Sequence, residues 1–198
     1  YAPELALYLG KRNVACAMLP LSSRYTRIVL LNWQQPVPGA GEETWRIVLP
    51  YGAVTTLRAL YLSNGATLLP APARSVRWLA HGDSITQGAH ALHPGFTYVH
   101  LVADRLGWDA LNLGFGGAAW GDAEVAEYIA SRRDWDILSI AIGTNTYGTQ
   151  QASAADFAVC YDRFLAIIRR AQGRGVEHTQ PFRRYAERLP AGYHAGGT

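Results

Sequence analysis

Three short turns of the sequence carry groups that could perform acyl-transfer chemistry, and each turn follows an apolar run. The first turn, HGDSITQG, contains Ser84. The second turn, NLGFGGAAWG, is rich in glycine. The third turn, IGTNTYG, contains Asn145. A serine hydroxyl can attack an ester carbonyl, while backbone N–H groups and a side-chain amide can stabilise the oxyanion that forms. Each turn alone has a simpler explanation, because Ser84 or Asp83 can cap a helix and a turn asparagine usually bonds to its own backbone.

The glycines of the second turn also fit a different chemistry. Gly114, Gly116 and Ala119 match G-x-G-x-x-A, a variant of the fingerprint that binds dinucleotides. That fingerprint requires an acidic residue at the end of the next strand, where this sequence has Gly143. The sequence therefore favours dinucleotide binding less than acyl transfer, but leaves it open.

Predicted strands and helices alternate around these turns. The strands are expected at 75–81, 109–114 and 136–143, and the helices at 96–107, about 122–131 and about 153–172. The apolar face of the first helix is expected to consist of Val99, Val102, Ala103 and Leu106. Such alternation predicts an α/β fold with parallel strands, whose carboxyl ends lie along one edge of the sheet. The three turns should meet at that edge.

The first 72 residues predict β-structure of another kind. Strands are expected at 26–33, 44–50 and 56–62, separated by turn-forming residues. Strands at this spacing favour a small antiparallel sandwich, and the stretch 68–75, with two prolines, predicts a domain boundary. We therefore expect a β-sandwich accessory domain over residues 1–72 and a catalytic domain over residues 73–198.

The blocks HGDSITQG, NLGFGG and IGTN, in this order, resemble those of the SGNH or GDSL hydrolase family over about residues 74–172. The segment 58–72 resembles part of the β-sandwich in a two-domain subgroup that is similar to carbohydrate esterases and small-molecule acyltransferases. The resemblance implies a three-layer, flavodoxin-like parallel sheet. It implies that Ser84 is the nucleophile and that the Gly117 N–H and the Asn145 amide, with the Ser84 N–H, form the oxyanion hole.

The same resemblance implies a serine esterase or acyltransferase that acts on small-molecule or carbohydrate acyl esters through an acyl-enzyme. Asp83 is expected to shape the turn around the nucleophile. No metal or organic cofactor is implied. The sequence does not distinguish water from another hydroxyl as the acyl acceptor, and it leaves the acyl and alcohol groups of the substrate open.

The catalytic base of this family is missing from its expected place. The family carries a D-x-x-H motif late in the chain, but no aspartate follows Asp162, and His178 and His194 are the only later histidines. We therefore expect a shortened or altered C-terminus and weak or no catalysis. The competing hypothesis is that His178, or else His194, is recruited as the base. A non-catalytic module that binds a sugar or an ester also stays open. His90 and His93 could line the site, or could be solvated loop residues.

Composition and charge exclude several other classes of protein. With 49% apolar and 17% charged residues, the chain is typical of a folded protein rather than a disordered one. The net charge of +3 comes from the two ends of the chain, whereas residues 73–160 are net acidic, which argues against a nucleic-acid partner. No apolar run is long enough to span a membrane, so we expect a soluble protein, with the cytoplasm slightly favoured over secretion. Cys16 and Cys160 are expected to be buried thiols, and the oligomeric state stays open.

Overall fold

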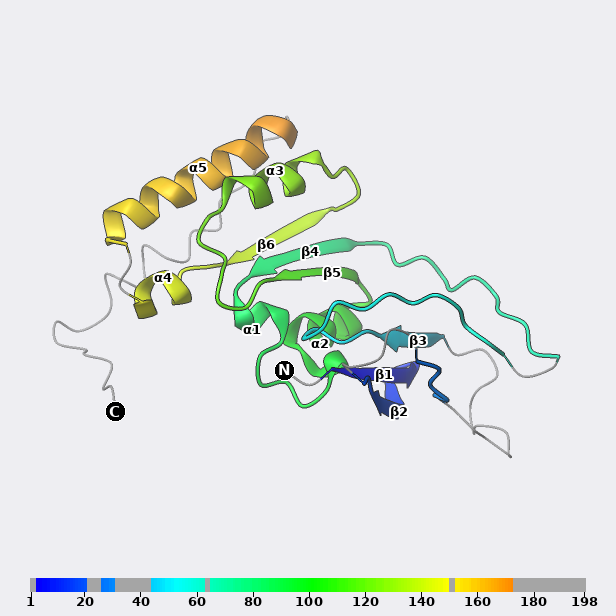
Figure 1. Cartoon of the computed structure of the whole chain (residues 1–198). Helices are drawn as coiled ribbons and strands as arrows, with labels where there is room; N and C mark the ends of the chain where they lie inside the picture. Colours follow the sequence, from blue (N-terminus) through cyan, green and yellow to red (C-terminus); the bar gives the residue numbers. More distant parts are fainter. Residues whose placement is uncertain (1–2, 21–25, 31–43, 63–64, 150–151, 173–198) are drawn as a thin grey trace.

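An antiparallel sheet forms the N-terminal part of the molecule (Figure 1). The computed structural model describes residues 3–20, 26–30, 44–62, 65–149 and 152–172. The sheet has the order β2-β1-β3 and consists of β1 (Glu4–Leu9), β2 (Arg12–Met18) and β3 (Trp45–Val48). β1 and β2 form a tight hairpin, because Gly10 adopts a φ of 57° that glycine reaches without strain. The central strand β1 is buried along most of its length, so it anchors this sheet.

The second sheet is parallel and lies where the sequence predicts it. Its order is β5-β4-β6, with β4 (Arg77–Gly82), β5 (Asp109–Gly114) and β6 (Ile137–Ala141). β4 is central and buried from its second residue onward, as expected for a parallel strand covered on both faces. Gly82 pairs with Gly114 on one side and with Ala141 on the other, so the three strands end at one edge.

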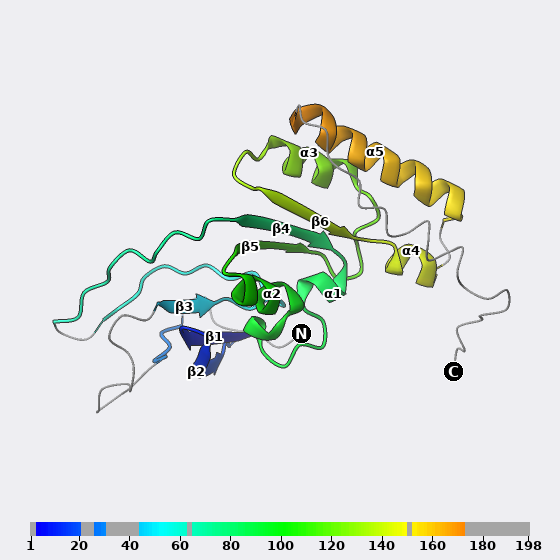
Figure 2. The same ribbon diagram turned by 180° about the vertical axis from the view of Figure 1, so that it is seen from behind.

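Helices cover both faces of the parallel sheet, as Figures 1 and 2 show. α2 (Tyr98–Leu106) packs on the face that carries Trp78 and Ala80. α3 (Ala123–Ser131) and α5 (Ala154–Gln172) pack on the opposite face, which carries Leu79. Three short helices are α1 (Ser84–Gln87), η1 (Pro94–Phe96) and α4 (Thr144–Thr149). This three-layer arrangement confirms the predicted flavodoxin-like α/β class.

The antiparallel sheet lies on the α2 side of the parallel sheet (Figure 2). Arg46 in β3 donates two hydrogen bonds to the Asp104 carboxylate in α2. Burial alone would raise the pKa of Asp104, but the hydrogen bonds and charge of Arg46 outweigh it and hold that pKa below its ordinary value. The Tyr51 hydroxyl donates to the Ala91 carbonyl at 3.0 Å. The two sheets are therefore joined through α2 and the loop that follows α1.

The N-terminal strands differ from the prediction. Segment 44–50 is confirmed as β3, but the described residues 26–30 and 56–62 form no strand, and residues 31–33 lie outside the described part. β1 and β2 are strands that the pattern did not predict. The strands among the described residues before 73 form one antiparallel sheet, in agreement with a β-domain that precedes the parallel sheet. Segment 56–62 is exposed along its length, so its apolar residues have no core to face.

Two predictions of burial were also wrong. In α2, Val99 and Ala103 are buried as expected, but Val102 and Leu106 are 37% and 50% exposed because the helix buries only a narrow stripe. Cys16 and Cys160 are exposed rather than buried. Cys16 lies on β2, an edge strand.

Within the described residues, no helix combines the length and the apolar character needed to cross a lipid bilayer.

Candidate active site

Ser84 is the first residue of α1, and one residue, Asp83, separates it from the end of β4. The N-cap of α1 is Asp83, whose carboxylate accepts a hydrogen bond from the Ile85 N–H at 2.9 Å. Asp83 is 4% exposed, whereas Ser84 is only partly buried. Asp83 therefore has the capping role that the sequence left open between the two residues, and the Ser84 hydroxyl is not needed for it.

The glycines at the ends of β4 and β5 are there because α1 passes extremely close to both strands. A Cβ at Gly82 would lie 2.1 Å from the Thr86 hydroxyl oxygen, and a Cβ at Gly114 would lie 2.0 Å from the Gln87 nitrogen. Both distances are far too short for any other residue. The space at Gly114 is thus occupied by α1, which explains this glycine without the pyrophosphate that a dinucleotide-binding turn would hold.

Partly buried hydrogen bonds fix α1 in this position. The Thr86 hydroxyl bonds to the Tyr98 hydroxyl at 2.9 Å, and the Asn112 amide donates to the Thr86 carbonyl at 2.7 Å. Asn112 also accepts from the Gly114 N–H at 2.9 Å, so its side chain ties α1 to the end of β5. The sequence analysis did not single out these positioning residues. Asn112 stands in the NLG block, but its partner Thr86 could only be identified once the strand order was known.

The second turn places Gly117 on the exposed side of the same edge. The Phe115 N–H donates to the Gly82 carbonyl at 2.9 Å, which joins the second turn to the first. Gly117 has a φ of 71°, and a Cβ built there would meet no atom within 4 Å. The backbone of Gly117 therefore faces open space.

The third turn is held against the second. Asn145 lies in the first turn of α4, after β6, and its side-chain amide donates to the Ala118 carbonyl at 2.6 Å. This bond orients the Asn145 amide beside the backbone of Gly117. The structure therefore brings the three predicted turns, with Ser84, Gly117 and Asn145, to one edge of the sheet.

Three of the four described histidines are engaged by partners other than Ser84. His81 is fully buried in β4, where its Nδ1 lies 2.9 Å from the Leu113 carbonyl oxygen and its ring stacks on Phe164. Burial lowers the pKa of His81, and the bond to Leu113 offsets this only in part, so the ring is neutral. His93 lies 2.8 Å from the Glu4 carboxylate, and His100 lies 2.8 Å from the Thr97 hydroxyl. These contacts do not suit a general base for Ser84.

His90 is exposed in the loop after α1. The candidates His178 and His194, and the C-terminal tail with them, lie outside the described residues.

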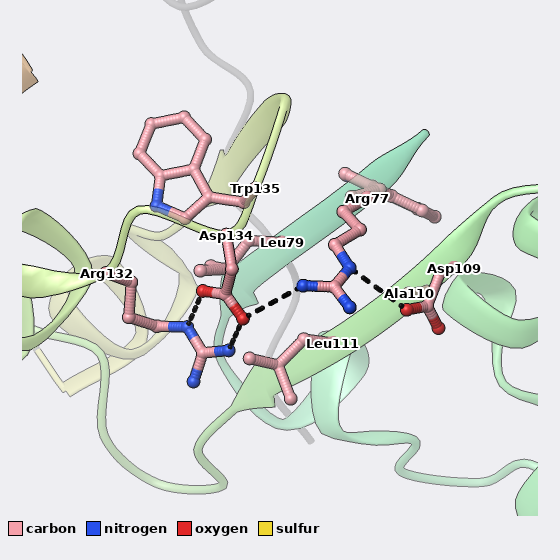
Figure 3. Close-up of a pocket in the computed structure, with 9 residues that line it drawn as sticks. Arg77, Leu79, Asp109, Ala110, Leu111, Arg132, Asp134 and Trp135 are labelled. Carbon is pink, nitrogen blue, oxygen red and sulfur yellow. Dashed lines mark hydrogen bonds and ion pairs between the residues drawn. The ribbon is translucent and has the colours of Figure 1, made fainter. Parts of the chain in front are cut away.

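A hollow of about 260 Å³ lies at the opposite edge of the sheet, where β4 and β5 begin (Figure 3). Its charged side chains pair with one another: Arg77 lies 3.4 Å from Asp134 and 3.6 Å from Asp109, and Arg132 lies 2.6 Å from Asp134. The residues that line it include no serine, cysteine or histidine. The hollow therefore offers no nucleophile, and the chemistry-bearing turns lie at the other end of the strands.

Comparison with known proteins agrees with this geometry. Residues 80–195 match the model of the GDSL-like lipase/acylhydrolase family. The fold is similar to that of the salicylyl-acyltransferase SsfX3 from a tetracycline biosynthetic pathway, with 22% identity and a TM-score of 0.66 over 87% of this chain and 47% of that one. It is also similar to a GDSL-like lipase candidate from Bacteroides ovatus, with 20% identity and a TM-score of 0.63 over 87% of this chain and 49% of that one. The chain thus spans about half the length of these two proteins. Among curated proteins, none matches the sequence.

Proposed function

Because the chain belongs to the GDSL-like lipase/acylhydrolase family, we propose that Ser84 is the nucleophile of a serine esterase or acyltransferase. In this proposal the oxyanion hole is formed by the Gly117 N–H and the Asn145 amide, together with the Ser84 N–H. The substrate is an acyl ester of a small molecule or a carbohydrate.

One observation carries the proposal: the three turns that follow β4, β5 and β6 are bonded to one another at a single edge. Phe115 links the second turn to the first, and Asn145 links the third to the second. A rigid edge of this kind suits an oxyanion hole, whose donors must be in position before the negative charge develops.

The proposed reaction has two steps. In the first, the Ser84 oxygen attacks the ester carbonyl carbon, its proton passes to a base, and the negative charge on the carbonyl oxygen is stabilised by the oxyanion hole. Collapse of this intermediate breaks the bond to the alcohol, which leaves with a proton returned by the base, and the acyl group stays on Ser84. In the second step water or another hydroxyl attacks the acyl-enzyme by the same route, and Ser84 is regenerated.

The acceptor in the second step decides between esterase and acyltransferase. The name of SsfX3, a salicylyl-acyltransferase, supports transfer to a second hydroxyl as one outcome for this fold. The base is part of the proposal as well, with His178 as our first candidate and His194 as the second.

A fluorophosphonate probe tests the nucleophile directly, because it forms a covalent bond only with an activated serine. We expect one modified residue, Ser84, when the labelled 198-residue chain is digested and mapped. Ser84→Ala should abolish labelling. Ser131→Ala is the matched control, since the Ser131 hydroxyl donates to the Tyr128 carbonyl in α3 and takes no part in the site.

A non-catalytic binding module is the second candidate function, favoured by the engagement of His81, His93 and His100 in other contacts. It predicts no fluorophosphonate labelling, together with saturable binding of an acylated sugar in calorimetry. Labelling that is lost in His178→Ala would instead support both the esterase proposal and the choice of base.

A further inference from the structure

A cluster of three side chains lies where the antiparallel sheet meets the loop before η1. Glu4 is the first residue of β1, and Cys16 lies in the neighbouring strand β2. Cys16 is paired with Ala6, two residues beyond Glu4, so Glu4 and Cys16 are diagonal neighbours on one face of the sheet. His93, the N-cap of η1, reaches this face from the other region of the molecule.

The donor atoms of the three side chains converge on one point. His93 Nδ1 lies 2.8 Å from Glu4 Oε2 and 3.7 Å from Cys16 Sγ, and all three ligand atoms lie within 4.8 Å of one another. A catalytic relay would use the two ring nitrogens separately, one toward the thiol and one toward the carboxylate. Here His93 Nδ1 faces both Cys16 Sγ and the Glu4 carboxylate. Three ligand atoms that face one another in this way are typical of a site that binds a single ion.

The spacing also fits a zinc ion. With Zn–S bonds of about 2.3 Å and Zn–N and Zn–O bonds of about 2.0 to 2.2 Å, ligand atoms at tetrahedral angles lie roughly 3.3 to 3.6 Å apart. The distances of 2.8 Å and 3.7 Å from His93 differ from this by about half an ångström or less, and the Glu4 carboxylate lies within 4.8 Å of Cys16 Sγ. Small side-chain rotations would therefore accommodate the ion.

The charge and exposure of the cluster suit a divalent cation that prefers sulfur and nitrogen ligands. Zinc would displace the proton of the Cys16 thiol when it binds. The Asn13 amide, 3.3 Å from Cys16 Sγ, would then stabilise the thiolate. The Glu4 side chain is 15% exposed and the His93 side chain 38% exposed, so solvent reaches the cluster and a water molecule can supply a fourth ligand.

We propose that Glu4, Cys16 and His93 bind one zinc ion with a water molecule, and that this ion fastens the antiparallel sheet to the loop between α1 and η1. The His93 ring also packs edge-on against Phe96 in η1, at 5.4 Å between centroids, which orients its Nδ1 toward the sheet. The site is structural and separate from Ser84, so it does not depend on the proposed acyl-transfer activity.

Cobalt(II) tests the proposal, because it replaces zinc and gives a thiolate-to-cobalt charge-transfer band when cysteine binds it. The reduced 198-residue chain, first stripped with a chelator, should bind one equivalent of cobalt with that band and with the visible bands of a four-coordinate ion. Zinc should displace it. Cys16→Ser should remove the charge-transfer band, and His93→Ala and Glu4→Gln should each weaken binding by at least about tenfold. Cys160→Ser is the matched control and should keep the band, since it removes the other exposed cysteine.

Thermal unfolding gives a second readout that distinguishes an ion site from a simple Glu4–His93 ion pair. Zinc should raise the Tm of the parent chain and of Cys160→Ser, but not of Cys16→Ser or His93→Ala. An ion pair alone predicts lower stability in His93→Ala with no zinc dependence in any chain. The proposal is overturned if the parent chain shows no charge-transfer band, if the band survives Cys16→Ser, or if zinc leaves the Tm of the parent unchanged.

Discussion

The two edges of the parallel sheet are made by the same three strands, yet they hold their polar groups differently. At the amino edge, Arg77 forms ion pairs with Asp109 and Asp134. The three side chains are 54%, 59% and 43% exposed, respectively. At the carboxyl edge, Asp83 is 4% exposed and Thr86 is 1% exposed, and both are bonded to nearby groups of the turns. The amino edge thus has solvated charged side chains, whereas the carboxyl edge has buried polar side chains that are hydrogen-bonded.

This difference bears on which edge can support catalysis. Exposed ion pairs contribute little to stability and leave long side chains free to move. At the carboxyl edge, hydrogen bonds made by buried side chains hold the turns in one geometry. The glycines there allow close contact between α1 and the strands. The predictions below test this contrast, beginning with the carboxyl edge, where the expected effects are largest.

The largest effect is expected for Ser84→Ala. It removes the proposed nucleophile, so kcat/KM for a nitrophenyl ester should fall by at least about 10³-fold from whatever value the parent chain has. Asp83 supplies the N-cap of α1, so the free energy of unfolding in urea should change by less than about 0.5 kcal/mol. A Ser84→Ala variant that keeps most of the parent activity would show that the nucleophile is another residue.

Gly117→Ala is expected to act on both stability and rate. A φ of 71° strains any residue with a Cβ by about 1 to 2 kcal/mol, and the shifted N–H should lower kcat by about 10²-fold or more with a smaller change in KM. Gly107 is a matched control, because its φ is 70° and a Cβ there also meets no atom within 4 Å. Gly107→Ala at the end of α2 should cost similar stability and leave kcat unchanged. Equal kcat values in the two variants would contradict the role of Gly117.

Asn145→Ala should lower kcat by roughly 10² to 10³-fold, because the amide is proposed to act mainly in the transition state. The substitution also removes the bond to the Ala118 carbonyl, so a loss of about 1 kcal/mol in stability is expected. Steady-state kinetics measure the change in kcat, and urea unfolding measures the loss of stability. A change confined to KM would assign Asn145 to binding of the ground state.

The α/β half of the fold could be predicted from the sequence, because each strand of the parallel sheet is a largely apolar run followed by a glycine-containing turn. β4, β5 and β6 were identified in this way, and parallel pairing then placed Ser84, Gly117 and Asn145 at one edge. The N-terminal half was harder to predict. Segment 56–62 has the composition of a strand but pairs with no described strand, whereas β1 and β2 were missed although Gly10 marks their two-residue turn.

The proposed zinc ligands could not be predicted from spacing. His93 is 77 positions from Cys16 and 89 from Glu4 in the sequence, so no local motif joins them. The contact depends on how the two sheets dock, which local patterns do not encode. Likewise, the exposure of Cys16 follows from the edge position of β2 and not from its residue type.

A smaller effect is expected from His81, which lies under the carboxyl edge. Its pKa in the fold is below the ordinary value of 6.5, so the unfolded chain takes up a proton before the folded chain does. The contribution of neutral His81 to the free energy of unfolding is therefore fully present above about pH 6.5. It falls as the pH drops below that value, by at most about 1.4 kcal/mol per pH unit. In His81→Phe, urea unfolding between pH 6.5 and 5 should show a shallower loss than in the parent. The exposed His90→Gln is the control, and a parent-like slope in His81→Phe would contradict the assignment.

The smallest effect is expected at the amino edge. Arg77→Gln removes the ion pairs to Asp109 and Asp134, but it keeps the backbone bonds that join Arg77 to Asp136 at 2.8 Å. Because the lost pairs are exposed and screened by salt, Tm should fall by no more than a few degrees, and by less at high ionic strength.

The matched change at the carboxyl edge is Asp83→Ala, which removes a buried N-cap and should cost about 1 kcal/mol. Asp83→Ala should also lower kcat, because α1 carries Ser84. Arg77→Gln should leave kcat within about twofold of the parent value. The reason is distance: at the rise per residue of a β-strand, the two ends of these strands are about 15 to 20 Å apart. If Arg77→Gln lowered kcat as much as Asp83→Ala, the rigidity of the site would depend on the whole sheet and not on its carboxyl edge alone.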